Sequence, residues 1–345
     1  MFRFLSAFQA AKPVTAVVNE AVITVQPKET LLQAALRQGI DFPHSCRVGG
    51  CATCKCRLLE GRVKELTQAG YILSDDELDQ GYILACQSVP RGDVKIAVDL
   101  QAVARKQVTG RVIGQEALTH DIVRLRIQLD EALLYKAGQF AHVELSSLPG
   151  VARSYSFASP VQPDAQVSFF VRLVPGGRFS AHVHTQKLVG QSVSVEGPMG
   201  DFWLRPAEAP MLMVAGGSGL APVLAVLEDA LAQDVKRPVC LLFGARTQAD
   251  LYAQDDIAAL ARQWPSQFEF VPVLSQEPEG STWAGLRGPV SDALVHHVVP
   301  GCHAYLCGPP PMVDAVQTQL LERGVLRSLI HADRFSTLHD MSVAA

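Results

Sequence analysis

The sequence predicts a multidomain protein in which an α+β unit, an antiparallel β-barrel and a doubly wound α/β sheet follow one another. Three observations predict this order. Four cysteines lie in the first quarter of the chain, repeated strand-like segments begin at Gln107, and strands alternate with helices after Pro210. A chain of 345 residues exceeds one ordinary core and favours two or three domains. We expect these domains at residues 12–102, 106–206 and 208–345.

The composition excludes several functional classes. The formal net charge is −4 and no run of Lys or Arg occurs, so nothing indicates a nucleic-acid-binding surface. No apolar stretch reaches the roughly 18 residues that a membrane-spanning helix needs. Lys12 interrupts the apolar beginning too early for a signal peptide, and we expect a short amphipathic extension there. The eight cysteines are clustered, which favours a metal site in a reducing cytoplasm over disulfides.

The first unit begins with a predicted β-hairpin over residues 14–26, where two runs of β-branched residues flank Asn19-Glu20. Apolar residues at helical spacing then predict a helix that ends before Gly39. The remaining expected elements are a strand at 54–59, a short helix opened by Ser74 and Glu77 as a capping box, and strands around Leu84 and at 94–98.

The cysteine spacing indicates an iron–sulfur site. C-R-V-G-G-C-A-T-C places Cys46, Cys51 and Cys54 in a C-x4-C-x2-C pattern, and Cys86 follows in L-A-C-Q-S. This is the plant-type spacing of four thiolates around a [2Fe–2S] cluster. A structural zinc site is the alternative, but zinc sites usually present two paired knuckles, whereas Cys86 stands alone. Cys56 is expected to be a buried apolar thiol, and Cys240 and Cys302 are also expected to be structural.

The second unit carries six strand-like segments with little helix between them, which predicts an antiparallel barrel. R-S-Y-S at Arg153–Ser156 offers a guanidinium to a pyrophosphate, a ring for stacking and a hydroxyl, as flavin binding requires. An exposed strand with a chance aromatic explains this segment equally well. In V-P-G-G-R-F-S, Gly176 and Gly177 precede a helix-start Ser180, which offers N–H groups and a hydroxyl to phosphate. A plain turn is the alternative.

The third unit combines two motifs that point to a nucleotide. G-G-S-G-L-A-P at 216–222 lies between an apolar strand and a helix, where a pyrophosphate would meet a helix N-terminus. It is not the G-x-G-x-x-G fingerprint. C-G-P-P-P from Cys307 ends a later strand, at the edge where doubly wound sheets bind ligands, although a rigid turn also explains the prolines. A second helix is expected near 251–264.

Together these motifs resemble the NAD(P)H-dependent reductase component of bacterial aromatic-ring dioxygenases and related multicomponent oxygenases. The resemblance covers essentially the whole chain. It implies a plant-type ferredoxin (β-grasp) domain fused to a ferredoxin–NADP reductase-like module, with FAD, a [2Fe–2S] cluster and a nicotinamide nucleotide as cofactors. The matching stretches are the cysteine pattern with L-A-C-Q-S, T-H-D-I-V-R-L-R-I, R-S-Y-S, V-P-G-G-x-x-S, G-G-S-G-L-A-P-V-L, Y-L-C-G-P-P-P-M and I-H-A-D-R-F.

The resemblance also implies roles for individual residues. Tyr155 and Ser156 would contact the flavin, and Cys307 would lie near the nicotinamide ring. Phe335 matches the aromatic residue that covers the flavin in related proteins, although ten more residues follow it here. These four residues form the implied catalytic set. The implied cofactor-binding set is Arg153, Tyr155, Ser156, Val171, Gly176, Gly177, Ser180, Gly216, Gly217, Gly219, Arg246, Asp250, Cys307, Gly308 and Phe335.

The residues after the second nucleotide-domain strand favour NADH over NADPH. An NADPH site gathers cations for the 2′-phosphate, whereas a carboxylate suits the bare ribose of NADH. Arg246 and Thr247 could serve a phosphate, but Asp250 argues against it.

The implied function is electron transfer, in which a hydride from NADH reaches FAD and single electrons pass through the cluster to a ferredoxin or a terminal oxygenase. Cys302-His303 lacks the second pair that a Rieske centre needs, so oxygen activation is expected in a partner protein. Alternative acceptors are a soluble di-iron monooxygenase and a deoxysugar-forming dehydrase. A redox-sensing or zinc-stabilised binding module without turnover is the alternative from another class, and it predicts a protein without cluster absorption.

Overall fold

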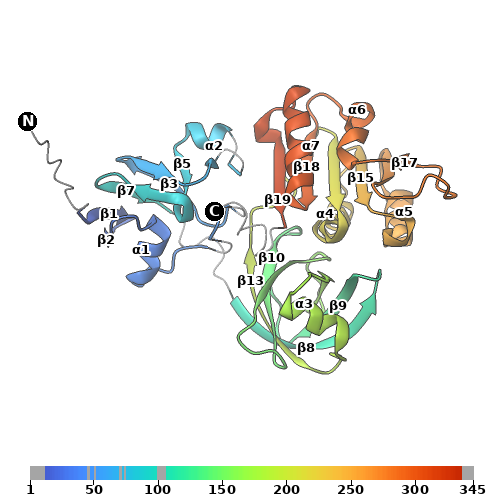
Figure 1. The fold of residues 1–345 in the computed structure, drawn as a ribbon, viewed down its shortest axis with the longest axis horizontal. Helices are drawn as coiled ribbons and strands as arrows, with labels where there is room; N and C mark the ends of the chain where they lie inside the picture. The colour runs from blue at the N-terminus through green and yellow to red at the C-terminus, as the bar shows by residue number, and fades with distance from the viewer. Residues whose placement is uncertain are drawn as a thin grey trace, which may run out of the picture. The chain divides into compact units, whose positions relative to one another are not determined.

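The computed structural model describes residues 12–44, 47–49, 52–69, 72–73, 75–98 and 106–335. The chain divides into two compact units, Met1–Ala104 and Arg105–Ala345, and each is described by itself (Figure 1). The second unit contains two separate six-stranded sheets, so three folds follow one another in the predicted order. The exact limits of the three domains stay a prediction. Within these described ranges, no helix is long and apolar enough to cross a membrane.

The first unit is built on a five-stranded mixed sheet. Its elements are β1 (Val14–Val18), β2 (Ala21–Val25), α1 (Leu31–Arg37), β3 (Lys55–Glu60), β4 (Val63–Glu65), α2 (Asp75–Asp79), β5 (Tyr82–Leu84), the 3-10 turn η2 (Ala85–Gln87), β6 (Ser88–Pro90) and β7 (Val94–Ala97). The strand order is β2-β1-β7-β3-β5, and β4 pairs with β6 in a separate ribbon. The order confirms the predicted α+β unit.

Local sequence explains where the elements of this unit begin and end. β1 and β2 form the predicted antiparallel hairpin around Asn19, whose φ is +54°. Thr30 and Gln33 form a capping box that opens α1, and Gly39 follows the helix end with φ +79°, a conformation that glycine adopts without strain. Ser74, from the other predicted capping box, lies outside the described residues.

The core of the first unit brings two of the cysteine segments together. α1 packs on the sheet through Leu31 and Leu32, which are buried together with Cys56 and Ile96. β3 pairs antiparallel with β5, and the Ala85 N–H donates to the Cys54 carbonyl at 3.0 Å. The segment before β3 and the turn η2 therefore lie side by side.

The second unit begins with the predicted antiparallel barrel. Its elements are β8 (Lys106–Ala117), β9 (Ile122–Leu129), β10 (Phe140–Leu145), β11 (Arg153–Ser156), β12 (Gln166–Arg172), α3 (Arg178–Thr185) and β13 (Ser192–Met199). The strand order is β11-β10-β13-β8-β9-β12, and every pair is antiparallel. A bridge between Phe157 and Phe169 joins the two ends of the sheet and nearly closes the barrel.

The rest of the unit is a parallel sheet, as the alternating pattern predicts. Its elements are β14 (Met211–Gly216), η3 (Gly217–Gly219), α4 (Leu220–Ala232), β15 (Val239–Ala245), η4 (Gln248–Asp250), α5 (Gln254–Gln263), β16 (Phe268–Leu274), β17 (Leu286–Arg287), η5 (Val290–Ala293), α6 (Leu294–His297), β18 (His303–Gly308), α7 (Pro310–Glu322), η6 (Arg327–Leu329) and β19 (Ile330–Arg334). The helix expected near 251–264 is shorter at its beginning, because Ala253 has φ +55° and precedes the helix as its cap.

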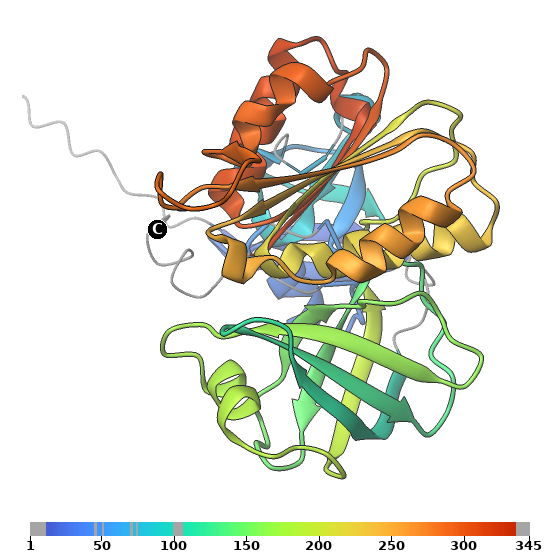
Figure 2. The ribbon, with the colours of Figure 1, turned by 90° about the vertical axis from the view of Figure 1, so that its right-hand side faces the viewer.

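The strand order of this sheet indicates the edge at which a ligand would bind. The order is β17-β16-β15-β14-β18-β19, and all pairs are parallel. From β14 the chain adds strands on one side as far as β17, and then returns to add β18 and β19 on the other side of β14. Doubly wound sheets bind ligands at this switch point, beyond the carboxyl ends of the strands. Helices cover both faces, with α4 and α5 on one side and α7 on the other (Figure 2), which explains why every residue of β14 is buried.

The barrel and the parallel sheet share one apolar core. Ile122 and Phe170 of the barrel are buried in the same cluster as Leu224 of α4 and Phe243 of β15. The Tyr252 ring packs edge-on against both Phe170 and Phe243, with centroids 5.6 Å apart in each pair. This cluster fixes the carboxyl edge of the sheet against the ends of β9 and β12.

Glycines permit the close approach of β14 to β18 at the switch point. A Cβ atom at Gly219 would lie 2.3 Å from the Cys307 carbonyl oxygen, and one at Gly216 would lie 2.5 Å from the Met312 sulfur. The space at these two positions is therefore filled by the neighbouring strand and helix.

Gly219→Ala should destabilise the second unit by about 1–3 kcal/mol, the cost of overpacking a filled core. Urea unfolding followed by circular dichroism measures the change. Gly280→Ala is the matched control, because no heavy atom lies within 4 Å of the Cβ position there. Its effect should stay within about 0.5 kcal/mol. Equal stability of the two variants would contradict the packing argument.

Candidate functional site

The cysteine loop of the first unit presents two sulfur atoms with N–H donors around them. Cys54 and Cys86 are 3% and 5% exposed, and neither forms a disulfide. The Cys86 N–H points at the Cys54 sulfur over 3.5 Å, and the Gln87 amide lies 3.7 Å from the Cys86 sulfur. N–H donors of this kind stabilise thiolates that bind metal. The other two predicted ligands, Cys46 and Cys51, lie outside the described residues.

Cys56 differs from these sulfurs in its surroundings. It lies on β3, is 1% exposed and packs in the core of the first unit. Burial and the nearby Cys86 raise the pKa of its thiol, so Cys56 stays protonated. The expectation of a buried structural thiol is confirmed.

The barrel brings R-S-Y-S and the start of α3 together. β11 pairs with β10, so that Tyr155 lies opposite Ala141. The ring of Tyr155 packs at a tilt against Phe179 of α3, with centroids 5.3 Å apart. Arg153 is exposed, Tyr155 is half-buried and Ser156 is buried. A guanidinium and part of an aromatic ring thus face outward beside the first turn of a helix.

The turn before α3 is held by Ser180. Its hydroxyl accepts from the Val174 N–H at 3.1 Å and donates to the Gly177 carbonyl at 3.2 Å. Gly176 has φ +71° and no heavy atom within 4 Å of its Cβ position, so this turn is open on one side. The first N–H groups of a helix have no partner within the helix and can bind phosphate. Ser180 shapes this turn, and its direct contact with phosphate stays a prediction.

Val171, another implied cofactor residue, lies just before this turn. Its side chain is fully buried in the barrel core, and its carbonyl lies 3.1 Å from His184 Nε2. The side chain of Val171 therefore packs inside the barrel.

The switch-point edge gathers the predicted nucleotide residues. Gly216 ends β14, and Gly217, with φ +54°, begins the turn η3 that leads into α4. Gly308 ends β18 with φ +150°, and a Cβ there would lie 3.1 Å from the Gly216 backbone. The Gly217 carbonyl accepts a hydrogen bond of 2.8 Å from the Tyr252 hydroxyl. The two glycine segments therefore form one narrow backbone surface at the start of a helix.

Cys307 and Phe335 lie at the same edge. Cys307 is fully buried, and burial raises the pKa of its thiol well above its usual range. The Phe335 N–H donates to the Gly308 carbonyl at 2.9 Å, and the Phe335 side chain packs against the core shared with the barrel. Phe335 therefore lies beside Cys307-Gly308, while residues 336–345 lie outside the described residues.

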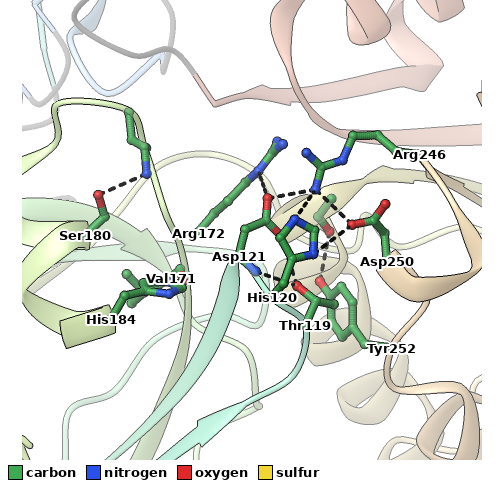
Figure 3. A network of polar contacts seen from close by, with 12 residues as sticks. Thr119, His120, Asp121, Val171, Arg172, Ser180, His184, Arg246, Asp250 and Tyr252 are labelled. Atoms are coloured by element: carbon green, nitrogen blue, oxygen red, sulfur yellow. Dashed lines mark hydrogen bonds and ion pairs between the residues drawn. The ribbon is translucent and has the colours of Figure 1, made fainter. Parts of the chain in front are cut away.

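Arg246 and Asp250 form part of an ion-pair network between the barrel and the sheet (Figure 3). Arg246 Nη2 donates to Asp250 Oδ1 at 2.8 Å and to Asp121 Oδ2 at 2.9 Å. Asp121 Oδ2 also accepts from Arg172 Nε at 3.2 Å. The second oxygen of Asp250 accepts from the N–H and the hydroxyl of Thr247. One carboxylate thus bridges two arginines that come from different domains.

The charges of this network favour an ionised Asp121. Burial alone would raise its pKa, but the Thr119 hydroxyl and the charges of Arg172 and Arg246 together lower it. The pKa of Arg246 is raised, because its carboxylate partners outweigh the effect of burial. Asp121 and Arg246 are therefore both charged near neutral pH.

Sequence reasoning missed three members of this region. Asp121 and Arg172 received no individual role, although T-H-D-I-V-R was noted as a matching stretch, and Tyr252 was not singled out. Arg172 lies at the nucleotide turn, with Nη1 3.4 Å from the Cβ position of Gly217. Their only signal in the sequence was nearness to the motifs, because their contacts depend on how the two domains pack.

The described residues fit the three expected groups. Sulfur atoms with N–H donors suit a cluster, an open glycine turn beside an aromatic ring suits a flavin, and a narrow glycine edge at a helix start suits a dinucleotide. No general acid–base pair is needed for this chemistry, because FAD, NAD(P)H and a [2Fe–2S] cluster supply hydride and electron transfer when bound.

Three family models match consecutive parts of the chain. A 2Fe-2S iron-sulfur cluster binding domain matches residues 16–91, an oxidoreductase FAD-binding domain matches 109–203, and an oxidoreductase NAD-binding domain matches 213–318. These matches confirm the expected cluster, FAD and NAD(P) cofactors.

Relatives align along nearly the full length. The xylene/toluene monooxygenase electron transfer component XylA of Pseudomonas putida is 44% identical over 89% of each chain. The reductase component of the naphthalene 1,2-dioxygenase system of Pseudomonas putida is 36% identical over 92% of this chain and 96% of its own. The solved structure of the Amycolatopsis cytochrome P450 reductase GcoB is 34% identical, covers 94% of this chain and 99% of its own, and has a TM-score of 0.70. The chain therefore belongs to the family of iron–sulfur flavoprotein reductases that supply electrons to bacterial multicomponent oxygenases.

Proposed function

We propose that this protein oxidises NADH and delivers single electrons to a component of an aromatic-hydrocarbon oxygenase. One observation carries the proposal. Asp121 accepts hydrogen bonds from Arg172 of the barrel and Arg246 of the parallel sheet, at 3.2 and 2.9 Å. This bridge would hold a flavin bound to the barrel close to a nucleotide bound at the edge of the sheet, as direct hydride transfer requires.

The chain's own residues supply binding and position. Tyr155 would offer its ring to a flavin, and the amides at the start of α3 would bind the flavin's phosphates. The turn η3 would hold the dinucleotide, with Arg172 beside this turn. Phe335 covers the same edge through its backbone bond to Gly308. The thiol of Cys307 is fully buried and its pKa is raised well above its usual range, so it would add no charge near a nicotinamide bound at this edge.

NADH is the proposed donor because the local charges oppose a 2′-phosphate. The guanidinium of Arg246 already faces two carboxylates, Asp121 and Asp250. Both oxygens of Asp250 already accept hydrogen bonds from Arg246 and Thr247. Asp250 would therefore select against a phosphate by its negative charge and not by a hydrogen bond to the ribose. A phosphate dianion placed here would face two carboxylates, and the two arginines beside them, Arg172 and Arg246, are already paired with these carboxylates.

The acceptor is proposed to be an aromatic-ring dioxygenase system, reached through a ferredoxin or directly at the oxygenase. A monooxygenase is the second candidate. The observation that favours the monooxygenase is the identity of 44% to a monooxygenase component, against 36% to a dioxygenase component.

The cytoplasm is the proposed location. NADH is a cytoplasmic donor, and the six cysteines in the described part of the chain form no disulfide. Thiols in this state are typical of a reducing compartment.

Cys86→Ser should abolish the cluster. Iron per chain should fall from about two to near zero and the visible cluster absorption should disappear, because four thiolates hold a plant-type cluster. FAD content should be unchanged. Iron analysis and absorption spectra measure both.

Cys56→Ser is the matched control for this change. It alters a cysteine two residues from a proposed ligand, yet it should keep full iron content and cost about 1 kcal/mol of stability as a buried polar substitution. Iron retained in Cys86→Ser, or lost equally in Cys56→Ser, would contradict the ligand assignment.

Steady-state kinetics should give a kcat/KM for NADH at least about tenfold above that for NADPH, equal to about 1.4 kcal/mol of discrimination. Asp121→Asn removes one of the opposing charges and should narrow this ratio by about fivefold, or about 1 kcal/mol. Asp130→Asn makes the same charge change on an exposed carboxylate bonded to Thr109, and should leave the ratio unchanged. A wild type that prefers NADPH would refute the choice of donor.

Anaerobic stopped-flow experiments can identify the acceptor. The NADH-reduced protein is mixed with a purified ferredoxin, dioxygenase or di-iron monooxygenase component, and the oxidation of its cluster is followed by absorbance. We expect the cognate class to react at least about tenfold faster than the others, since partner surfaces are electrostatically matched. Equal and slow rates with all three would contradict an oxygenase role.

A further inference from the structure

A second group of side chains lies at the opposite end of the parallel sheet from the nucleotide turn. Cys240 of β15, Glu269 of β16 and His297 of α6 each offer one ligand atom, and these atoms all lie within 4.8 Å of one another. His297 Nδ1 is 3.3 Å from Glu269 Oε2. None of these residues belongs to the proposed electron-transfer path.

The sheet register builds two sides of this cluster. Cys240 and Glu269 are direct partners in the parallel pairing of β15 with β16. Cys240 shares its face with Leu242, and both pack in the apolar cluster that also contains Leu294 of α6. Directly paired residues of adjacent strands point to the same face, so the thiol and the carboxylate emerge together beneath α6. His297 then closes the group from the end of that helix.

The three side chains match the coordination preferences of one metal ion. We propose that Cys240, Glu269 and His297 bind a Zn²⁺ ion, with water as the fourth ligand. Thiolate sulfur, imidazole nitrogen and carboxylate oxygen are the three ligand types that zinc takes in proteins, and three protein ligands plus water is a common arrangement. Side-chain exposures of 44% for Glu269 and 14% for His297 leave a path from solvent to the site.

A second triad of possible ligands differs from this one in the cations that lie beside it. His120, Asp121 and Asp250 also lie within 4.8 Å of one another. Arg246 bonds both carboxylates of that triad, and Arg172 bonds Asp121, so cations already occupy the oxygen atoms. In the first group, burial, Glu269 and Cys302 raise the pKa of Cys240, and none of these effects comes from a cation.

Binding couples zinc to one proton. The pKa of the Cys240 thiol is raised to about 12 by burial, by the charge and hydrogen bond of Glu269 and by Cys302. The thiol is therefore protonated at neutral pH. Zinc replaces that proton, so that Cys–SH and Zn²⁺ give Cys–S–Zn⁺ and H⁺, and no redox change occurs.

The ion would join three elements that are far apart in sequence. It would fix α6 to β15 and β16 at the amino-terminal edge of these strands, away from Gly216 and Gly308. Its expected effect is on the stability of the nucleotide domain, independent of the proposed electron transfer.

Equilibrium dialysis tests the site in the iron- and FAD-loaded protein. Zinc and iron per chain are measured by elemental analysis across buffered free Zn²⁺ concentrations. We expect one zinc per chain with iron content unchanged. Cys240→Ser and His297→Ala should each weaken binding by at least about 100-fold, since even outer-shell changes cost 10–100-fold. Both should also lose the zinc-dependent rise in Tm.

His296→Ala is the matched control, because it removes an exposed histidine next to the proposed ligand. It should bind zinc like the wild type.

Bound FAD and circular dichroism report folding, and if one ligand variant does not fold, the other variant decides the test. The proposal is overturned if the wild type takes up no zinc at micromolar free ion, if a folded ligand variant binds it unchanged, or if uptake displaces iron.

Discussion

Hydride transfer between two domains requires one fixed separation of their binding faces, and in this protein an apolar core shared by the barrel and the parallel sheet sets it. Ile122 and Phe170 lie in the same buried cluster as Leu224 and Phe243. Tyr252 completes the contact, because its ring packs on both phenylalanines while its hydroxyl binds the Gly217 carbonyl. The nucleotide turn is therefore anchored to the same core that positions the flavin barrel, and the two faces cannot shift independently.

The ion pairs above this core add direction to a contact that is otherwise non-directional. Apolar packing resists separation but tolerates small rotations, whereas hydrogen bonds to a carboxylate restrict the angle as well. Asp121 accepts hydrogen bonds from two arginines and a hydroxyl, and these bonds compensate for the cost of burying its charge. Loss of either arginine would leave a partly buried carboxylate with fewer partners, and this is the costly case for such networks.

The sequence was most informative where function depends on neighbouring residues. The hairpin around Asn19 and the glycine turn after β14 are local patterns, and the fold confirms the elements they predict. The cysteine spacing is also local, and the match to a 2Fe-2S cluster binding domain over residues 16–91 supports it. Side-chain direction was harder to predict. The Ser180 hydroxyl turns inward to Val174 and Gly177, and Cys307 is fully buried. The bridge through Asp121 joins residues about 50 and 125 positions apart, and no spacing rule covers contacts that arise only from domain packing.

The amide of Gln87 has a consequence for the driving force of electron flow. Its N–H group lies 3.7 Å from the sulfur of Cys86, a proposed ligand, and Gln87 is itself 8% exposed. A hydrogen bond to a ligand sulfur stabilises the more negative, reduced form of an iron–sulfur cluster and so raises its reduction potential. If Cys86 binds the cluster, Gln87 would raise the reduction potential of the cluster, and a change at this position would alter that potential without removing a ligand.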